Sequence, residues 1–234
     1  MTFNFPPETV DALSFMKVNA VSLANNHTSN AGTKGLESTR SMMEKVEITP
    51  IGGPGDQDVA QIGSFMGNGL TLKVIAVHLL ASQPDLTALI KELSADPNNR
   101  VVIMPHWGNE YQEKHNSFQE KLAHIWIDAG AAAVIGSHPH VIQDAEVYAG
   151  KPVFYSVGNL LFDQTFSQPT QEGLLIGGQF TEKGVELFAL PTGMKNFQPL
   201  LLTGSNKTRI LTKLYAGLDK EPSAEPKTWR LLLP

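Results

Sequence analysis

Strand-length apolar runs alternate with helix-patterned segments over residues 7–135, and this alternation limits the possible fold more than any other feature. Four short runs rich in Val, Ile and Leu are typical of buried strands: Ala20–Ala24, Leu70–Val77, Arg100–Met104 and Ala132–Ile135. Four other segments repeat apolar residues at the helix period: Pro7–Val18, Gly35–Val46, Asp85–Leu93 and Ser117–Ala129. Such alternation predicts parallel strands joined by helical crossovers.

The pattern changes after Pro139, where strand-like segments follow one another with only turns between them. The segments are Glu146–Tyr148, Val153–Val157, Leu174–Thr181 and Val185–Ala189, with turns that include Ala149-Gly150 and Lys183-Gly184. Strands joined in this way predict antiparallel hairpins. Ser205–Tyr215 has the pattern of a closing helix, so we expect one α/β (α+β) domain over residues 1–215 and a C-terminal tail over residues 216–234.

Composition excludes several classes of protein. The 234 residues contain 18 Lys and Arg against 23 Asp and Glu, and this net charge of −5 provides no basic field for nucleic acid. With 41% hydrophobic and 18% charged residues, the chain is too apolar to be disordered. The lack of cysteine excludes disulfide partners and thiolate ligands, so any metal needs nitrogen and oxygen ligands. We expect a soluble chain as given, because it contains neither a membrane-length apolar segment nor a signal-like start.

Three histidine-bearing segments each follow a predicted strand, at the place where α/β sheets bind ligands. They are Asn25-Asn26-His27-Thr28, Pro105-His106-Trp107-Gly108 and Gly136-Ser137-His138-Pro139-His140. Neutral imidazole is the commonest protein ligand for divalent transition metals, so the closely spaced His138 and His140 favour a metal site. The ring of His106 and the amide oxygen of Asn26 are further candidate ligands, and His27 is a candidate proton donor to a leaving group.

A structural explanation stays open for each of these segments. His138 and His140 can instead bond to the loop backbone, and His106 can be a histidine whose ring nitrogens are satisfied by backbone groups. The polar residues around His27 are common in turns. The remaining histidines lack motif context and are expected to be structural: His78, His115 and His124. Of the aromatic residues that could stack on a ligand, Trp107 is near the predicted site and Trp126 is expected in the core.

Four stretches together resemble the calcineurin-like metallophosphatase superfamily, and within it the CapA branch of poly-γ-glutamate capsule biosynthesis proteins. They occur in the family's order and are Leu23–Thr28 with Gly32 and Gly35-Leu36, His106–Tyr111, Gly136–Gln143 and Gly150–Gln164. The resemblance implies a four-layer αββα sandwich of two mixed sheets flanked by helices. It also implies that Asn26, His106 and His138 serve one metal ion. By the same resemblance, His140 serves a second ion and His27 is the catalytic imidazole.

The sequence departs from the family pattern near its start. The acidic motifs of the family should precede Asn26, where the chain offers only Glu8 and Asp11, both in a predicted helix. The chain therefore resembles a CapA protein that lacks its N-terminal portion. The family implies one or two Mn, Zn or Fe ions. Two divalent ions would repel each other among neutral ligands, so we expect at most one to be well held. Further candidates to support a ligand or contact substrate are Glu110, Asn159 and Asp163, although Glu110 and Asp163 can equally be ordinary surface carboxylates.

Two functions from different classes fit these observations. One is a metal-dependent hydrolase-type domain, phosphoesterase-like, that makes or processes poly-γ-glutamate capsule or a related polymer of the bacterial cell envelope. Its substrate would be a phosphoester or a polymer amide, because metal hydroxide attacks either centre. The alternative is a non-catalytic accessory module that binds an anionic polymer or a membrane-bound capsule synthase. An incomplete gene product without a stable role is a third possibility.

Overall fold

A six-stranded mixed sheet forms the centre of the fold in the computed structural model, which describes residues 2–181, 184–216 and 231–232. Its strands, in chain order, are β3 (Gly63–Gly67), β4 (Leu70–His78), β5 (Asn99–His106), β6 (Ala133–Ile135), β7 (Ala145–Tyr148) and β8 (Lys151–Phe154). In space the order is β3-β4-β5-β6-β8-β7. The four inner strands run parallel, whereas β3 and β7 pair antiparallel at the edges.

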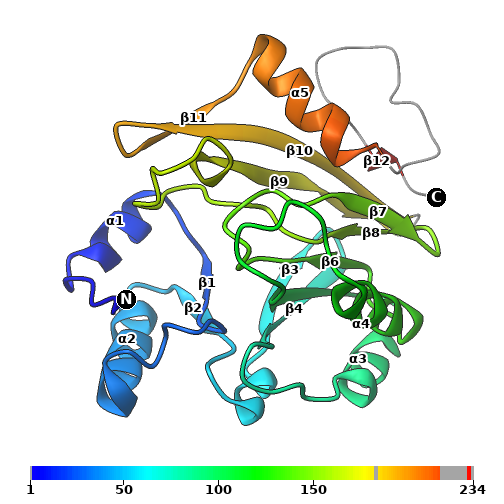
Figure 1. Cartoon of the computed structure of the whole chain (residues 1–234). Coiled ribbons are helices and arrows are strands. Elements are labelled where there is room, and N and C mark those ends of the chain that lie inside the picture. The colour runs from blue at the N-terminus through cyan, green and yellow to red at the C-terminus, as the bar shows by residue number, and fades with distance from the viewer. Residues whose placement is uncertain (1, 182–183, 217–230, 233–234) are drawn as a thin grey trace.

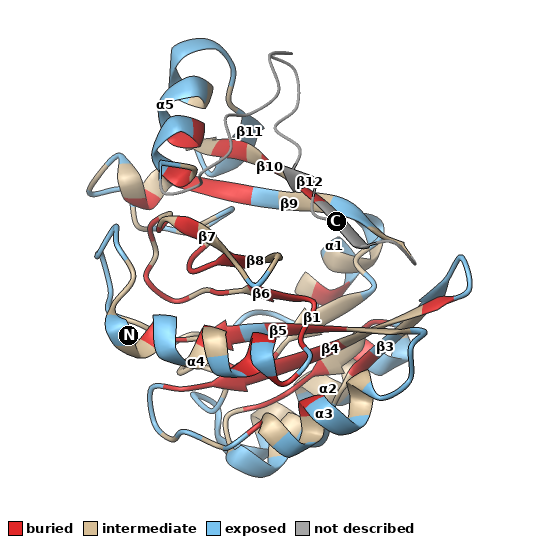
Figure 2. Ribbon diagram, turned by 90° about the vertical axis from the view of Figure 1, so that its right-hand side faces the viewer, coloured by how far each residue is buried: buried red, intermediate tan, exposed pale blue. Residues whose placement is uncertain are grey.

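The six-stranded sheet has helices on one face and a second sheet on the other (Figures 1 and 2). The helices are α3 (Thr87–Ser94) and α4 (Ser117–Asp128). The second sheet is antiparallel and pairs β9 (Glu172–Thr181), β11 (Gln198–Leu201) and β12 (Leu231–Leu232) with the long β10 (Gly184–Lys195). The helix α5 (Gly204–Leu214) packs against this second sheet and completes four layers. The structure thus confirms the expected αββα architecture, except that the described strands of the second sheet are all antiparallel rather than mixed.

Alternation along β5 shows how the sequence builds these layers. Val101 and Ile103 belong to the apolar cluster under α3 and α4, and the intervening Val102 packs with Leu174 and Ala189 of the second sheet. Successive strand residues point to opposite faces, so a continuously apolar run buries both faces of a central strand. Such a strand is held rigidly from both sides, which fixes the position of the residues at its end.

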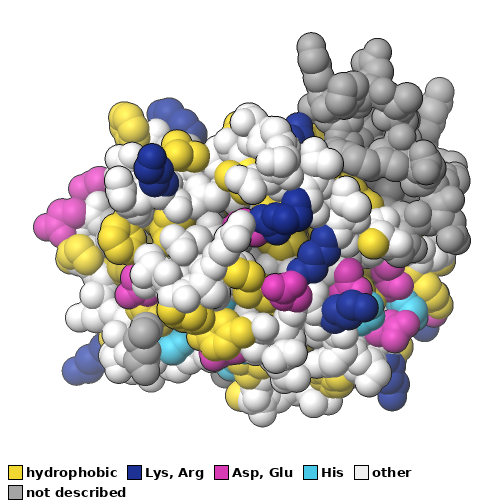
Figure 3. Space-filling model, turned by 45° about the horizontal axis from the view of Figure 1, so that its top comes forward, with side chains coloured by type: hydrophobic (Ala, Val, Ile, Leu, Met, Phe, Trp, Pro, Cys, Tyr) yellow, Lys and Arg dark blue, Asp and Glu magenta, His cyan; other side chains and the backbone are white. Residues whose placement is uncertain are grey.

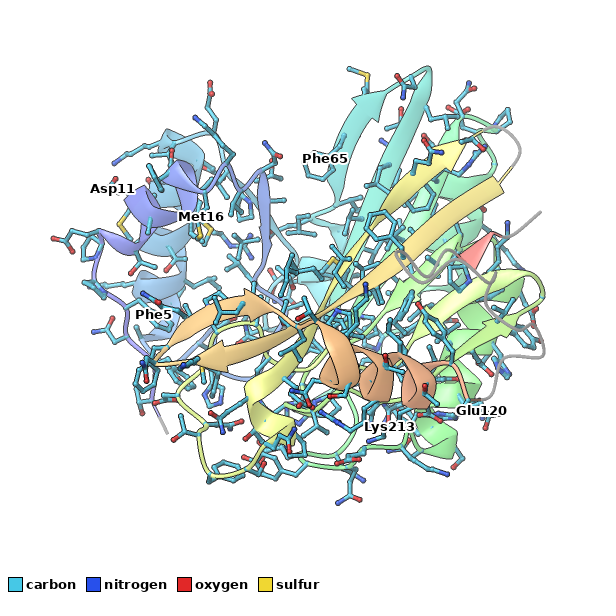
Figure 4. The ribbon with its side chains drawn as sticks, turned by 90° about the horizontal axis from the view of Figure 1, so that it is seen from above. Phe5, Asp11, Met16, Phe65, Glu120 and Lys213 are labelled. Carbon is cyan, nitrogen blue, oxygen red and sulfur yellow. The ribbon has the colours of Figure 1, made fainter. Side chains whose placement is uncertain are left out.

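A smaller unit formed by the first fifty residues lies at one end of the molecule (Figure 1). It contains a parallel pair, β1 (Ala20–Ser22) and β2 (Thr49–Ile51), with the helices α1 (Thr9–Phe15) and α2 (Gly32–Lys45). These elements share an apolar cluster around Leu23, Met43 and Ile48. In the view from above, Phe5 and Asp11 lie in this unit, on the far side of the molecule from Glu120 (Figure 4).

The structure corrects the sequence prediction in several places. The strands β2, β3 and β11 were not predicted, and Asp56–Ala60 forms the 3₁₀ helix η1 just before the antiparallel β3–β4 pair. A second 3₁₀ helix, η2, covers Pro169–Gln171. The β7–β8 hairpin at Ala149-Gly150 is confirmed, whereas Lys183 lies outside the described residues, as does most of the tail 216–234. None of the described helices is long and apolar enough to cross a membrane.

Candidate metal centre

Three neighbouring parallel strands deliver histidines to the same edge of the large sheet. The strand register pairs His78, the last residue of β4, with His106, the last residue of β5. Beyond β6, Ser137 continues the ladder, because its N–H donates to Pro105 O (2.9 Å) and its carbonyl accepts from the N–H of Trp107 (3.1 Å). His138 therefore follows directly beside His106, and their ring centroids are 4.7 Å apart.

The turn after β1 adds an amide to this group. Asn26 Oδ1 lies 3.0 Å from His106 Nε2, although 80 positions separate the two residues. The rest of the turn supports its own backbone, since Asn25 Oδ1 accepts from the N–H of His27 (2.8 Å) and Thr28 Oγ1 donates to Leu23 O (2.6 Å). The structural explanation is thus correct for Asn25 and Thr28, while Asn26 faces the imidazoles.

The donor set fits a divalent ion. His106 Nε2 and Asn26 Oδ1 lie 3.0 Å apart and are both potential metal ligands, so one ion can be held by both. At the other side, His140 Nδ1 donates to Asn159 Oδ1 (3.0 Å), and Asn159 is itself held by its Nδ2 donating to Thr170 O (2.9 Å). Metal-binding histidines typically donate their second ring N–H in this way, which directs the free lone pair to the metal.

Burial keeps two of these rings neutral. Burial, together with the smaller effect of the neighbouring imidazoles, of which His138 is the largest, lowers the pKa of His106 to about 2. Burial likewise lowers the pKa of His138 to about 4, with a further contribution from His140. Both rings are therefore uncharged at neutral pH, the form in which imidazole binds a metal ion.

The loop between β5 and α4 brings a carboxylate to the group. Tyr111 N donates to Pro139 O (2.8 Å) and so ties this loop to the loop of His138 and His140. Glu110, His138 and His140 each offer one ligand atom, and the three atoms lie within 4.8 Å of one another. The backbones of His138 (φ 102°) and His140 (φ 60°) both adopt the left-handed region.

A buried amide pair that the sequence did not reveal as important fixes this loop. Gln119 Nε2 donates to Gln143 Oε1 (2.9 Å), and Gln143 Nε2 donates to the carbonyls of Gln112 (2.9 Å) and Lys114 (3.0 Å). Both glutamines are at most 1% exposed. A buried amide keeps such a position only when its hydrogen bonds are made, so the pair defines the path of the loop that carries Glu110.

The other sequence candidates divide between the group and its surroundings. His27 adjoins it, with Nδ1 3.1 Å from Asn30 Oδ1 and its ring edge-on to Phe3. Asp163 is exposed, and among the described residues no hydrogen bond or ion pair joins it to the histidines. Trp107 is completely buried between Trp126 and Tyr155, so it cannot stack on a ligand and the interpretation as a stacking residue is wrong.

Three histidines were expected to be structural. His115 and His124 are bonded to Asp144 (3.0 Å) and Glu146 (2.7 Å) respectively, and His124 also forms a group of potential ligands with Glu120 and Glu146, apart from the group of His138 and His140. His78 is closer to the site than its lack of a motif indicated, since its ring centroid is 5.8 Å from that of His106. The signal that could have placed it is its position at the end of β4, next to β5.

The fold and the site define a histidine-rich α/β protein whose candidate metal ligands lie where parallel strands end. The family model for bacterial capsule synthesis protein PGA_cap matches residues 1–164 of the chain. The chain belongs to this family.

Relatives of the chain are named for the synthesis of a capsule, of PGA or of polyglutamine. The chain is 30% identical to the capsule biosynthesis protein CapA of Bacillus anthracis over 91% of this chain and 57% of that protein. It is 29% identical to the PGA biosynthesis protein CapA of Bacillus subtilis over 77% of this chain and 52% of that protein. A probable polyglutamine synthesis accessory protein of Mycobacterium tuberculosis is 25% identical, with 69% and 50% covered. The chain thus spans about half the length of these relatives.

Solved structures with a related arrangement are more distant. The NAD nucleotidase of Haemophilus influenzae matches 90% of this chain and 48% of its own length, with 14% identity and a TM-score of 0.44. A phosphatase from Mycoplasma pneumoniae matches 88% of this chain and 80% of its own, with 12% identity and a TM-score of 0.46.

Proposed function

We propose that this chain is a metal-dependent hydrolase-type domain that acts in the synthesis or processing of capsule polyglutamate. The observation that carries the proposal is the convergence of Asn26, His106 and His138 at one sheet edge, from segments far apart in the sequence. The names of the Bacillus relatives support the process, since both are biosynthesis proteins of a capsule or of PGA. We also propose the bacterial cell envelope as the place of action.

The residues of the chain have separate tasks in this proposal. Asn26, His106, His138 and His140 would provide ligands for one or two metal ions, which would supply Lewis acidity and an activated water at neutral pH. His27 donates a proton to the leaving oxygen or nitrogen, and Asn30 orients its ring through Nδ1. Phe162 packs against the ring of His140, with centroids 4.9 Å apart, and shields one side of it from water.

A non-catalytic accessory role is the second candidate. Within the part of the chain that the structure describes, Glu110 is the one carboxylate grouped with the site histidines, so the charge that two ions need is scarce. The Mycobacterium tuberculosis relative is named an accessory protein. In this role the same face would bind an anionic polymer or a membrane-bound synthase. On the face of the molecule seen in Figure 3, basic and acidic side chains are interspersed, so that face presents no broad field of one sign for a polymer.

Hydrolysis assays on two substrate classes test the proposal. The purified chain, loaded with Mn²⁺ or Zn²⁺, is assayed on a chromogenic phosphodiester and on poly-γ-glutamate. We expect turnover that falls about 100-fold or more in His27→Ala, because a positioned general acid contributes ~10²–10⁴-fold. The control is His124→Ala, which removes a histidine outside the site.

The outcomes separate the two candidates. Turnover that is equal in His27→Ala and His124→Ala would refute the assigned role of His27. No turnover of either substrate, together with polymer binding that persists in chelator, would favour the accessory role.

A further inference from the structure

We infer that Glu110, His138 and His140 form a self-contained site for one divalent transition-metal ion, with two imidazoles and one carboxylate as its ligands. The inference deepens the proposed function because it concerns the same sheet edge. It differs from the family pattern in that a glutamate from the loop after β5 supplies the charge. The three ligand atoms lie within 4.8 Å of one another, which is the spacing that a shared ion requires.

The three side chains are close without bonding to each other. Among the described residues, no hydrogen bond or ion pair joins Glu110 to either imidazole, whereas His106 and Asn26 close on one another at 3.0 Å. His138 is only 9% exposed, and its Nδ1 has no hydrogen-bond partner. A buried polar atom without a partner is costly, and a bound ion with its coordinated water would relieve that cost.

Supporting contacts orient the ligands. His140 donates Nδ1–H to Asn159, so its Nε2 lone pair is free for a metal. Glu110 precedes Tyr111, whose N–H is bonded to Pro139, the residue between the two histidines. The carboxylate and the imidazoles are therefore joined by one backbone hydrogen bond, which keeps the three ligands together before any ion arrives.

Charge also favours this set over a neutral one. A dication among imidazoles and amides gains no opposite charge, while Glu110 contributes a full negative charge at the partly exposed end of the site. Two imidazoles with one carboxylate form the ligand set of catalytic zinc sites and of non-haem iron sites with open positions. The open positions would take water and an anionic oxygen of the substrate.

Metal affinity measured without any reaction tests the inference. The full chain is stripped with chelator, titrated with Zn²⁺ against a chromophoric competitor, and analysed for bound zinc. We expect one ion per chain, and we expect Glu110→Gln to weaken the affinity for zinc by about 100-fold or more. The reason is that mutating even a residue that only supports a ligand weakens metal affinity by ~10–100-fold. Glu92→Gln, an exposed helix carboxylate with the same change of charge, is the matched control and should bind as the wild type does.

Two further variants locate the ion. Asn26→Ala should retain the first zinc ion, and Asn159→Ala should weaken it by ~10–100-fold. Metal-free melting temperatures establish that each variant is folded. Zinc affinity that is unchanged in Glu110→Gln but lost in Asn26→Ala would overturn the inference and leave the proposed hydrolase intact. Zinc held as expected by a chain without turnover would leave the metal site in place and overturn the hydrolase. A wild-type chain that binds no zinc would refute both.

Discussion

One added methyl group at Gly136, the residue that begins the two-histidine loop, should destabilise the protein severely. A Cβ at this position would lie 2.2 Å from Tyr155 O and 2.4 Å from Trp107 Nε1, where ordinary contact begins at 3.4 Å. Those two atoms are bonded to each other at 2.9 Å, and both residues are completely buried. The methyl group can fit only if the Trp107 ring or the β8 backbone moves by about 1 Å.

The expected magnitude follows from two costs. Overpacking a dense core costs ~1–3 kcal/mol, and losing the buried Trp107 hydrogen bond costs a further ~1–3 kcal/mol. Gly136→Ala should therefore lower the free energy of unfolding by about 2–6 kcal/mol, a large part of the ~5–15 kcal/mol of a typical domain. Because Gly136 is two residues from His138, Zn²⁺ affinity should fall as well.

Urea unfolding followed by tryptophan fluorescence measures the effect. Gly67→Ala is the matched control, since a Cβ there meets nothing within 4 Å, and its free energy of unfolding should stay within ~0.5 kcal/mol of the wild type. If Gly136→Ala unfolds within ~1 kcal/mol of the wild type, the packing argument for the loop is wrong.

Three further predictions concern stability. Asn116→Ala removes the side-chain oxygen that accepts hydrogen bonds from the first turn of α4. The free energy of unfolding, measured by thermal melting, should fall by ~1 kcal/mol. An unchanged melting temperature would show that the cap does not stabilise the helix. The hydrogen bond to Asp144 raises the pKa of His115 above 6.5; burial of Asp144 opposes ionisation, but its bonds from His115 still lower its pKa below 3.8. The pair thus stabilises the fold fully between about pH 4 and 6.5, and its contribution falls as the pH rises further. His115→Ala should therefore lower the free energy of unfolding by ~1 kcal/mol near pH 5.5 and by less near pH 8.5. An equal loss at both pH values would contradict this. Zinc at ~100 times its Kd should add ~2.7 kcal/mol to the free energy of unfolding, a gain that chelator or His138→Ala abolishes; stabilisation that persists in His138→Ala would place the ion elsewhere.

The sequence predicts the elements that apolar pattern alone determines. β4, β5 and β6 are buried on both faces, so their runs of Val, Ile and Ala stand out, and the histidines that follow them could be placed at one edge. β11 carries no such signal because all four of its residues are exposed. Its pairing depends on the neighbouring strand β10, which local sequence does not encode.

The candidate site could be predicted only in part for a similar reason. His106 and His138 lie at strand ends, and strand order determines where they meet. The approach of Glu110 depends instead on the path of an irregular loop, and that path depends on a hydrogen bond between two glutamines 24 positions apart. Gln143 ends one of the family-like stretches, but its partner Gln119 lies in none of them, so only the folded structure reveals the connection.

The left-handed backbone of His138 and His140 creates a conflict between thermal stability and metal binding. Each non-glycine residue held in this region costs ~1–3 kcal/mol, and glycine adopts it with almost no penalty. In a library of variants selected only for survival at high temperature, glycine should accumulate at both positions, and the selected proteins would be sturdier but unable to hold zinc. An engineer who wants a robust, metal-loaded enzyme must therefore fix these two histidines in advance and look for added stability elsewhere in the fold.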